Sequence, residues 1–234
     1  MTIFFNEPLI DSLLEAEEDL KTIKEVKYRY NSTLKDDLLE LNLLEVTHPN
    51  ITEFYKEVAD GFQLNWKKDE NSFGFIQLAE MKHLLAGVNG NGIYCNEDLP
   101  KDADIRFFHP LDFPTPETYV GFIIKPDTIY KSVYYLSGDN ELSNLDLDFQ
   151  GYTEMAFEAR VFNYWQRVLL EYMNGSSSAI TEIFKAEMPQ IFPDWSWEDF
   201  IAKFERLRIS KKKTYNGTIS HRKPAHHTQR HTGI

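Results

Sequence analysis

Four carboxylates are grouped around one predicted connection between a strand and a helix: Asp139, Glu141, Asp146 and Asp148. Paired carboxylates can bind a divalent cation through close oxygen ligands, or act as acid and base where their pKa values differ. The spacing does not match a calcium loop, because the DxDxDG order and its closing glutamate are absent. We therefore expect no metal site, and interpret the group as a solvated acidic rim or as a contact surface for a basic partner.

Histidines are concentrated in the last part of the chain, at His221, His226, His227 and His231. Histidine sites for transition metals need preorganised geometry and supporting hydrogen bonds, which a segment without periodicity does not supply. The same segment is basic, with six Lys and Arg from Lys211 onward and no acidic residue. Basic residues can neutralise phosphates, but this segment adjoins an acidic body. We expect neither a dedicated metal site nor a nucleic-acid partner.

The sequence offers little support for nucleophilic catalysis. Cys95 follows the NGNG segment at 89–92, and a thiol beside a histidine can form a nucleophile and base pair. His48, His83 and His109 have no serine or cysteine nearby in a recognisable nucleophile setting. GxxxxGK[ST], GxGxxG, HExxH and CxxC are also absent. We expect a non-enzymatic protein without a cofactor, and keep a hydrolase that uses the acidic group as an alternative.

Two tryptophans, Trp195 and Trp197, flank Ser196 at a predicted helix start. An exposed tryptophan is a typical anchor of a protein interface. Packing of the last helix against the domain is the competing interpretation, and it is favoured. We expect one of the two side chains to stay accessible, and take Trp195 as a tentative partner contact.

The segment 50–78 contains the clearest order of elements. Asn50 can cap a helix that ends at Gly61, where a left-handed residue has the least steric cost. Phe62, Leu64 and Trp66 then alternate with polar residues, which is the period of a half-buried strand. A polar turn over 67–72 and a second apolar segment over 73–76 complete a predicted hairpin.

Helical periodicity and turn residues place the other elements. A surface helix is expected over 11–30, a second helix from 32 or 33 to 44, and a short one over 78–85. Strands are expected at 105–108, 119–124 and 132–136, antiparallel because the loops are short. A long helix is expected over 149–173, followed by helices over 180–187 and from Ser196 to Leu207.

This order of elements resembles the SUKH superfamily of Smi/Knr-type proteins. The matching residues are Asp60, Gly61, Phe62, Trp66, Gly74 and Ile76, together with the segments 119–124, 132–136 and 145–157. The similar part covers residues 38–173. It departs from the family pattern at His48 and Pro49, where an "LP" pair is expected, and in an insertion over 88–104. The resemblance implies an α+β fold with a mainly antiparallel sheet between N- and C-terminal helices.

Composition indicates one domain, predicted over 1–209, with a flexible basic tail over 210–234. The chain has 234 residues and a net charge of -12, with 42% hydrophobic residues. It has one cysteine, and no apolar run reaches the length of a membrane helix. The N-terminus lacks the basic region and cleavage site of a secretory signal, so we expect a cytoplasmic protein that does not contact membranes.

The resemblance implies a function in protein binding. Bacterial SUKH-like proteins are similar to immunity proteins that bind a cognate toxin domain, often a nuclease or deaminase, and block it. An acidic surface complements a toxin whose active face is basic. The alternative from the same superfamily is a regulatory scaffold. The sequence thus predicts an immunity protein whose partner is a toxin with a basic surface.

Overall fold

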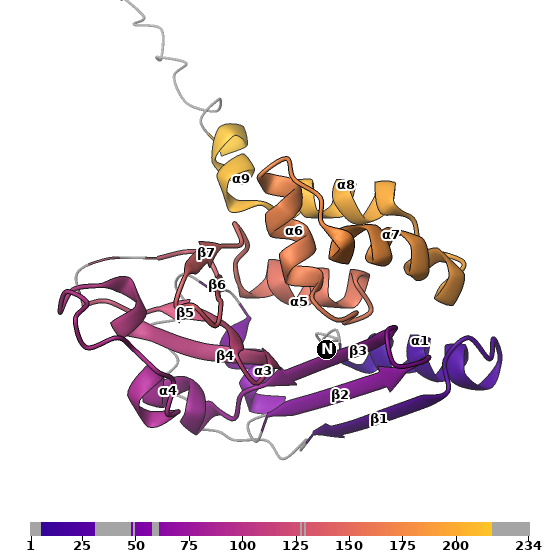
Figure 1. The fold of residues 1–234 in the computed structure, drawn as a ribbon, viewed down its shortest axis with the longest axis horizontal. Helices are drawn as coiled ribbons and strands as arrows, with labels where there is room; N and C mark the ends of the chain where they lie inside the picture. The colour runs from indigo at the N-terminus through magenta and orange to yellow at the C-terminus, as the bar shows by residue number, and fades with distance from the viewer. Residues whose placement is uncertain are drawn as a thin grey trace, which may run out of the picture.

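The computed structural model describes residues 6–30, 48, 50–57, 61–126, 128 and 130–216. Within this part the chain forms a seven-stranded antiparallel sheet, in which each strand lies beside its neighbour in sequence. Helices flank the sheet, with the C-terminal helices stacked on one side of it (Figure 1). The predicted α+β class with a mainly antiparallel sheet is confirmed.

The strands follow one another as β1 (Glu25–Tyr30), β2 (Phe62–Lys67), β3 (Phe73–Leu78), β4 (Phe108–Thr115), β5 (Thr118–Ile123), β6 (Tyr134–Leu136) and β7 (Leu142–Asn144). The helices are α1 (Asn6–Glu18), α3 (Ile51–Glu57), α4 (Met81–Gly90), the 3-10 turn η2 (Asp104–Phe107), α5 (Phe149–Glu158), α6 (Trp165–Met173), α7 (Ala179–Ile191), α8 (Trp197–Leu207) and α9 (Ile209–Asn216).

The predicted hairpin is present as β2 and β3. Its side chains alternate between buried and half-buried positions along β2, as period two requires. Gly61 precedes the hairpin with φ +84°, a conformation that glycine adopts without steric cost. A Cβ atom at Gly74 would lie 2.1 Å from Nε1 of Trp66, so the bare backbone of Gly74 makes room for the indole. Asp60, the remaining residue of this motif, lies outside the described residues.

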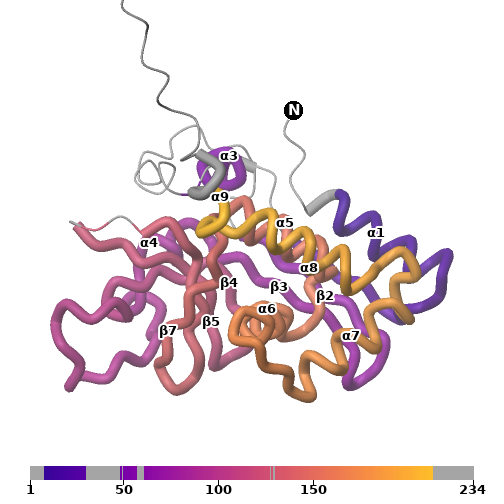
Figure 2. Tube along the Cα trace, turned by 90° about the horizontal axis from the view of Figure 1, so that it is seen from above, coloured from indigo at the N-terminus to yellow at the C-terminus, as the bar shows by residue number. Residues whose placement is uncertain are grey.

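The main core lies between the sheet and the helices on one of its faces. It joins Leu13 of α1, Phe54 of α3, Trp66 of β2 and Phe200 of α8 in one buried cluster. Seen from above, α5 and α8 extend over the strands of the sheet (Figure 2). A smaller cluster with Phe108 belongs to the side of the sheet that α4 covers. Among the described elements, most helices therefore cover one face of the sheet, whereas α4 and η2 lie on the other face beside β4 and β5.

Strands β3 and β4 separate after a single pair of residues, Leu78 and Asp112. The segment after α5 fills the resulting gap: the Phe75 amide donates to the Val161 carbonyl at 2.8 Å, and the Asn163 amide donates to the Phe73 carbonyl at 3.0 Å. The backbone of β3 thus exchanges its sheet partner for the connection between α5 and α6. This connection interrupts the single helix predicted over 149–173.

The first predicted helix also differs from the structure. Helix α1 ends at Glu18, and residues 25–30 form strand β1 instead of a continued helix. Val26 pairs with Trp66, and Tyr28 pairs with Leu64, so β-branched and aromatic residues join the hairpin edge. Tertiary pairing therefore overrides the apolar spacing that suggested a helix. The helix predicted over 32–44 lies outside the described residues.

The segment after residue 209 begins with an ordered element. Helix α9 covers residues 209–216, where the sequence predicts the start of a flexible tail. Residues 217–234, including the four tail histidines, lie outside the described part. In the part of the chain that is described, no helix has the length and apolar character needed to span a bilayer.

Candidate functional site

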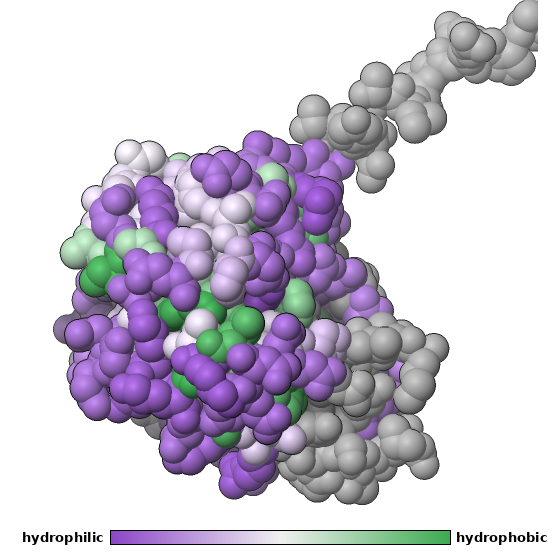
Figure 3. Space-filling view, turned by 90° about the vertical axis from the view of Figure 1, so that its right-hand side faces the viewer, coloured by the Kyte–Doolittle hydropathy of each residue, from purple (hydrophilic) through white to green (hydrophobic). Residues whose placement is uncertain are grey.

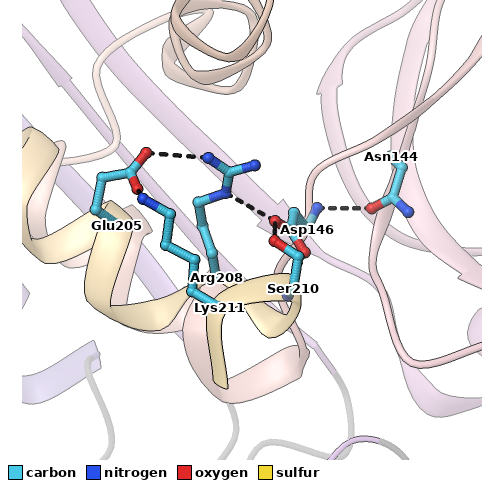
Figure 4. A network of polar contacts seen from close by, with 6 residues as sticks. All are labelled: Asn144, Asp146, Glu205, Arg208, Ser210 and Lys211. Carbon is cyan, nitrogen blue, oxygen red and sulfur yellow. Dashed lines mark hydrogen bonds and ion pairs between the residues drawn. The ribbon is translucent and has the colours of Figure 1, made fainter. Parts of the chain in front are cut away.

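The structure divides the predicted acidic group. Asp146 lies against the C-terminal segment, where its Oδ2 accepts a hydrogen bond from Nε of Arg208 at 2.7 Å (Figure 4). Its Oδ1 accepts from the backbone amide of Ser210 at 2.9 Å, and the Ser210 hydroxyl also bonds this carboxylate. Burial raises the pKa of Asp146, but the bonds from Ser210 and Arg208 outweigh it and leave the pKa below its ordinary value.

Asp148 also faces the C-terminal segment. Its Oδ1 accepts from the Gly151 amide at 2.7 Å and caps helix α5, while its Oδ2 lies 3.2 Å from Nζ of Lys212. We call the contacts of Asp146 and Asp148 with Arg208, Ser210 and Lys212 the C-terminal latch. The two carboxylates hold the start of α9 against the connection between β7 and α5.

Asp139 and Glu141 lie apart from the latch, in the turn between β6 and β7. Both side chains are exposed. The Asp139 carboxylate accepts from the Ser137 hydroxyl, and this bond lowers the pKa of Asp139. No cluster of three or more His, Cys, Asp or Glu suited to a metal ion occurs among the described residues. Of the four predicted carboxylates, these two are exposed, and Asp146 and Asp148 are half-buried.

Trp195 is buried with 4% of its surface exposed. Its Nε1 donates to the Glu158 carbonyl at 2.9 Å, and its ring contacts Phe184 and Phe200. Trp197 keeps a half-buried position at the start of α8. The accessible member of the pair is therefore Trp197, and Trp195 packs the last helices together.

The remaining candidate groups are dispersed. His48 is 1% exposed and its ring lies 4.2 Å from that of Phe122. Nδ1 of His83 contacts Oδ1 of Asn91 at 2.9 Å, and Nδ1 of His109 contacts the Leu84 carbonyl at 2.9 Å. Cys95 is a half-buried free thiol. The described hydrogen bonds include none that joins Cys95 to a histidine.

A cavity of about 890 Å³ lies on the face of the sheet that the C-terminal helices leave open. We call it the open-face groove. Partly buried aromatic residues line it: Phe73, Phe75, Phe113, Tyr119 and Tyr164. Side-chain amides lie among them: Asn65, Gln77, Asn91 and Asn163. Its charged residues are Glu25, Lys67 and Glu70. A second cavity of about 600 Å³ shares Gln77, Asn91 and Phe113 with the groove.

The sheet register creates this arrangement. On the open face Lys67 pairs with Phe73, Asn65 with Phe75, and Gln63 with Gln77, so polar side chains of β2 lie opposite the two aromatic side chains of β3. The separation of β3 from β4 widens the space beside Phe73 and Phe75. The connection after α5 then adds Asn163 and Tyr164 as a wall, with Tyr164 at φ +63°.

A buried carboxylate lies where β3 and β4 separate. Asp112 is fully buried. Its Oδ1 accepts from the backbone N–H of Gln77 at 2.9 Å, and its Oδ2 accepts from the Tyr152 hydroxyl at 2.5 Å. Nε2 of Gln166 donates to that hydroxyl at 2.9 Å. Burial raises the pKa of Asp112 to about 6, against the opposing hydrogen bonds. Asp112 thus connects the separated strands to α5 and α6.

Most of the surface seen from the right of Figure 1 is hydrophilic, with a small group of hydrophobic residues in a hollow near its centre (Figure 3). Apolar surface on this face is therefore limited in extent, and a partner would meet mainly polar groups around a small apolar area.

Comparison of the chain with protein-family models, curated proteins and solved structures gave no match. The resemblance to the SUKH superfamily therefore rests on the residue pattern and remains a prediction.

The groove was not predicted from the sequence. Its aromatic residues Phe73 and Phe75 look like members of an apolar strand, and Asn163 falls within a predicted helix. The available signal was the pairing of polar positions in β2 with aromatic positions in β3. Groove residues from β4, β5 and the α5–α6 connection could not be assigned without knowing that β3 and β4 separate.

Proposed function

We propose that the protein is a non-enzymatic immunity protein, which binds a toxin domain and blocks it by occlusion. The observation that supports this most is the open-face groove, where partly buried aromatic side chains lie beside side-chain amides. Aromatic anchors surrounded by polar groups are typical of protein interfaces, in which a few residues supply most of the binding free energy.

Charge supports a basic partner. The chain has a net charge of -12, and exposed Asp139 and Glu141 add a local acidic contact surface. Long-range attraction between an acidic protein and a basic toxin raises the association rate and falls with salt concentration. We place the interaction in the cytoplasm, where a toxin that acts on nucleic acid would have to be blocked.

The alternatives from the sequence have less support. A hydrolase based on Asp146 and Asp148 would need both carboxylates free to act on a substrate, whereas both are engaged in the C-terminal latch. A regulatory scaffold of Smi/Knr type would use the same groove for a different partner. Only binding to a toxin, with loss of its activity, separates an immunity protein from a scaffold.

Co-expression tests this proposal. The toxin to test is the C-terminal domain of any large secreted protein that is encoded beside this chain. We expect the intact chain to restore the growth of cells that produce this domain. Absence of rescue, with both proteins soluble, would contradict the immunity function.

The acidic contact surface has a matched control. Replacing Asp139 and Glu141 with lysine should weaken toxin binding about tenfold or more at low salt. Replacing the exposed Glu97 and Asp98 with lysine changes the net charge by the same amount at a different place. Equal weakening by both pairs would show that only the overall charge contributes.

A further inference from the structure

We propose that the open-face groove binds an extended, uncharged polypeptide segment that carries an aromatic side chain. The inference rests on the proposed function, because the segment would belong to the protein partner. It names a different contact from the acidic surface at Asp139 and Glu141, which would attract the partner from a distance.

The amides of the groove are available to a ligand. Within the described part of the chain, the side chains of Asn65, Gln77 and Asn163 form no hydrogen bond to another protein group. Asn91, in contrast, uses its Nδ2 for the carbonyls of His83 and Gly87 at 2.7 Å each. A side-chain amide both donates and accepts, and so can pair with the N–H and C=O of a peptide unit. Three available amides therefore suit a peptide backbone.

The charges of the groove are already paired within the protein. Nζ of Lys67 lies 2.6 Å from Glu70, and Nζ of Lys27 lies 2.7 Å from Glu25. Both pairs are largely exposed and lie on the β1–β2 side of the groove. The rest of the lining is uncharged. A strongly charged ligand would find no unpaired opposite charge there, so charge complementarity favours a neutral segment.

The aromatic lining determines the side chain that the segment should carry. The rings of Phe113 and Tyr119 lie 5.7 Å apart in an edge arrangement, and Phe73 and Phe75 contribute two further half-buried rings from β3. An aromatic side chain placed among them gains buried area and favourable edge contacts. The volume of about 890 Å³ lies in the range of pockets that enclose ligands.

Selection from a displayed library of random decapeptides tests this inference on the full chain. We expect enrichment of peptides that are uncharged and contain an aromatic residue. A synthetic peptide from this pool, labelled with a fluorophore, should bind the protein in a polarisation titration.

Asn65→Asp and Asn163→Asp keep the side-chain shape but replace the amide donors with charge, and together should weaken binding at least tenfold. Asn174→Asp, an exposed change in the segment after α6, should leave it unchanged.

Several results would overturn the inference. These are absence of enrichment, enrichment of basic peptides, or equal binding by the Asn65→Asp, Asn163→Asp double variant. Preferential binding to an oligosaccharide array, or dimerisation of the chain that Phe75→Asp abolishes, would assign the groove to another occupant. Rescue of toxin-producing cells by a chain that selects no peptide would reject only the groove assignment. Failure of the wild-type chain to rescue would instead reject the immunity function, while the peptide selection still decides what the groove binds.

Discussion

The indole Nε1 of Trp66 donates a hydrogen bond to the backbone carbonyl of Arg160 at 2.6 Å, across 94 residues of sequence. The bond joins the β2–β3 hairpin to the α5–α6 connection that forms one wall of the open-face groove. Trp66 therefore supports the groove from the core side of the sheet, without presenting its own ring to a ligand.

The hydrogen bond of Trp66 predicts that replacing this tryptophan destabilises the fold more than replacing Trp165, which is equally buried. Trp66→Phe should leave the Arg160 carbonyl without its donor and cost about 1–3 kcal/mol more than Trp165→Phe. Trp165 is equally buried at 1% exposure, but its Nε1 has no hydrogen-bond partner. Urea denaturation of both variants measures the difference in the free energy of unfolding. Equal losses would show that the Trp66 bond adds no net stability.

Asp112 predicts a pH dependence of stability. Burial raises the pKa of Asp112 from 3.8 to about 6. Between these two pH values the carboxyl group is protonated in the folded protein and ionised in the unfolded chain. The favourable contribution of Asp112 is complete below pH 3.8 and is lost as the pH rises through about 6.

Asp112→Asn removes this titration. The new side-chain amide can accept from the backbone N–H of Gln77 and donate to the Tyr152 hydroxyl. A turn of the Gln166 side-chain amide by 180° then replaces its Nε2 with Oε1, which accepts from that hydroxyl. As the pH rises from 4 to 7, the free energy of unfolding of the variant should increase by on the order of 3 kcal/mol relative to that of the wild type. Unfolding free energies at intermediate pH values measure this gain, with the exposed Asp102→Asn as control. Parallel curves for the wild type and Asp112→Asn would contradict the assignment.

The titration of His48 predicts the opposite dependence of stability on pH, with stability lost as the pH falls. Burial lowers its pKa from 6.5 to about 4, against the attraction of Asp148, so the unfolded chain takes up a proton more readily than the folded protein. Its contribution is complete above pH 6.5 and is lost as the pH falls toward 4. As the pH falls from 6.5 to 4, the free energy of unfolding of the wild type should decrease by on the order of 3 kcal/mol relative to that of His48→Gln. The same denaturation series tests this, and a constant difference between the two proteins would show that His48 does not titrate in this range.

The C-terminal latch predicts local rather than global destabilisation. Asp146→Ala removes the acceptor for Arg208 and Ser210 and should cost about 1–3 kcal/mol at the start of α9. Hydrogen exchange of the amides in 209–216 should become faster, because the helix loses its attachment. Asp139→Ala, which removes an exposed carboxylate in the β6–β7 turn, serves as the control. Unchanged protection of α9 would mean that the latch does not hold it.

Local sequence patterns were sufficient for the hairpin but not for its surroundings. Gly61, Phe62 and Trp66 define a helix end and a strand through short-range rules. The structure has the strand and a helix over 51–57, and the predicted helix end over 58–60 lies outside the described residues. Strand β1 was missed because its apolar residues fit a helical spacing until they pair with β2. The break between α5 and α6 depends on β3 accepting a new backbone partner at Phe75. Such long-range pairing leaves no local signal.

The candidate site was missed for the same reason. The acidic group looks like a surface feature in the sequence, yet Asp146 and Asp148 bind a segment more than 60 residues away, with Asp146 and Ser210 separated by 64 positions. The groove combines β2 and β3 with β4, β5 and the α5–α6 connection. Its free amides are recognisable only after the register shows that Asn65 lies opposite Phe75.

The most direct test of the central claim is a titration of the purified toxin domain's activity with this chain. The account predicts stoichiometric inhibition by the wild type and by Asn174→Asp. The Asn65→Asp, Asn163→Asp double variant should need at least a tenfold higher concentration for half inhibition, while retaining the wild-type free energy of unfolding. Equal inhibition by the double variant and the wild type would contradict occlusion through the open-face groove.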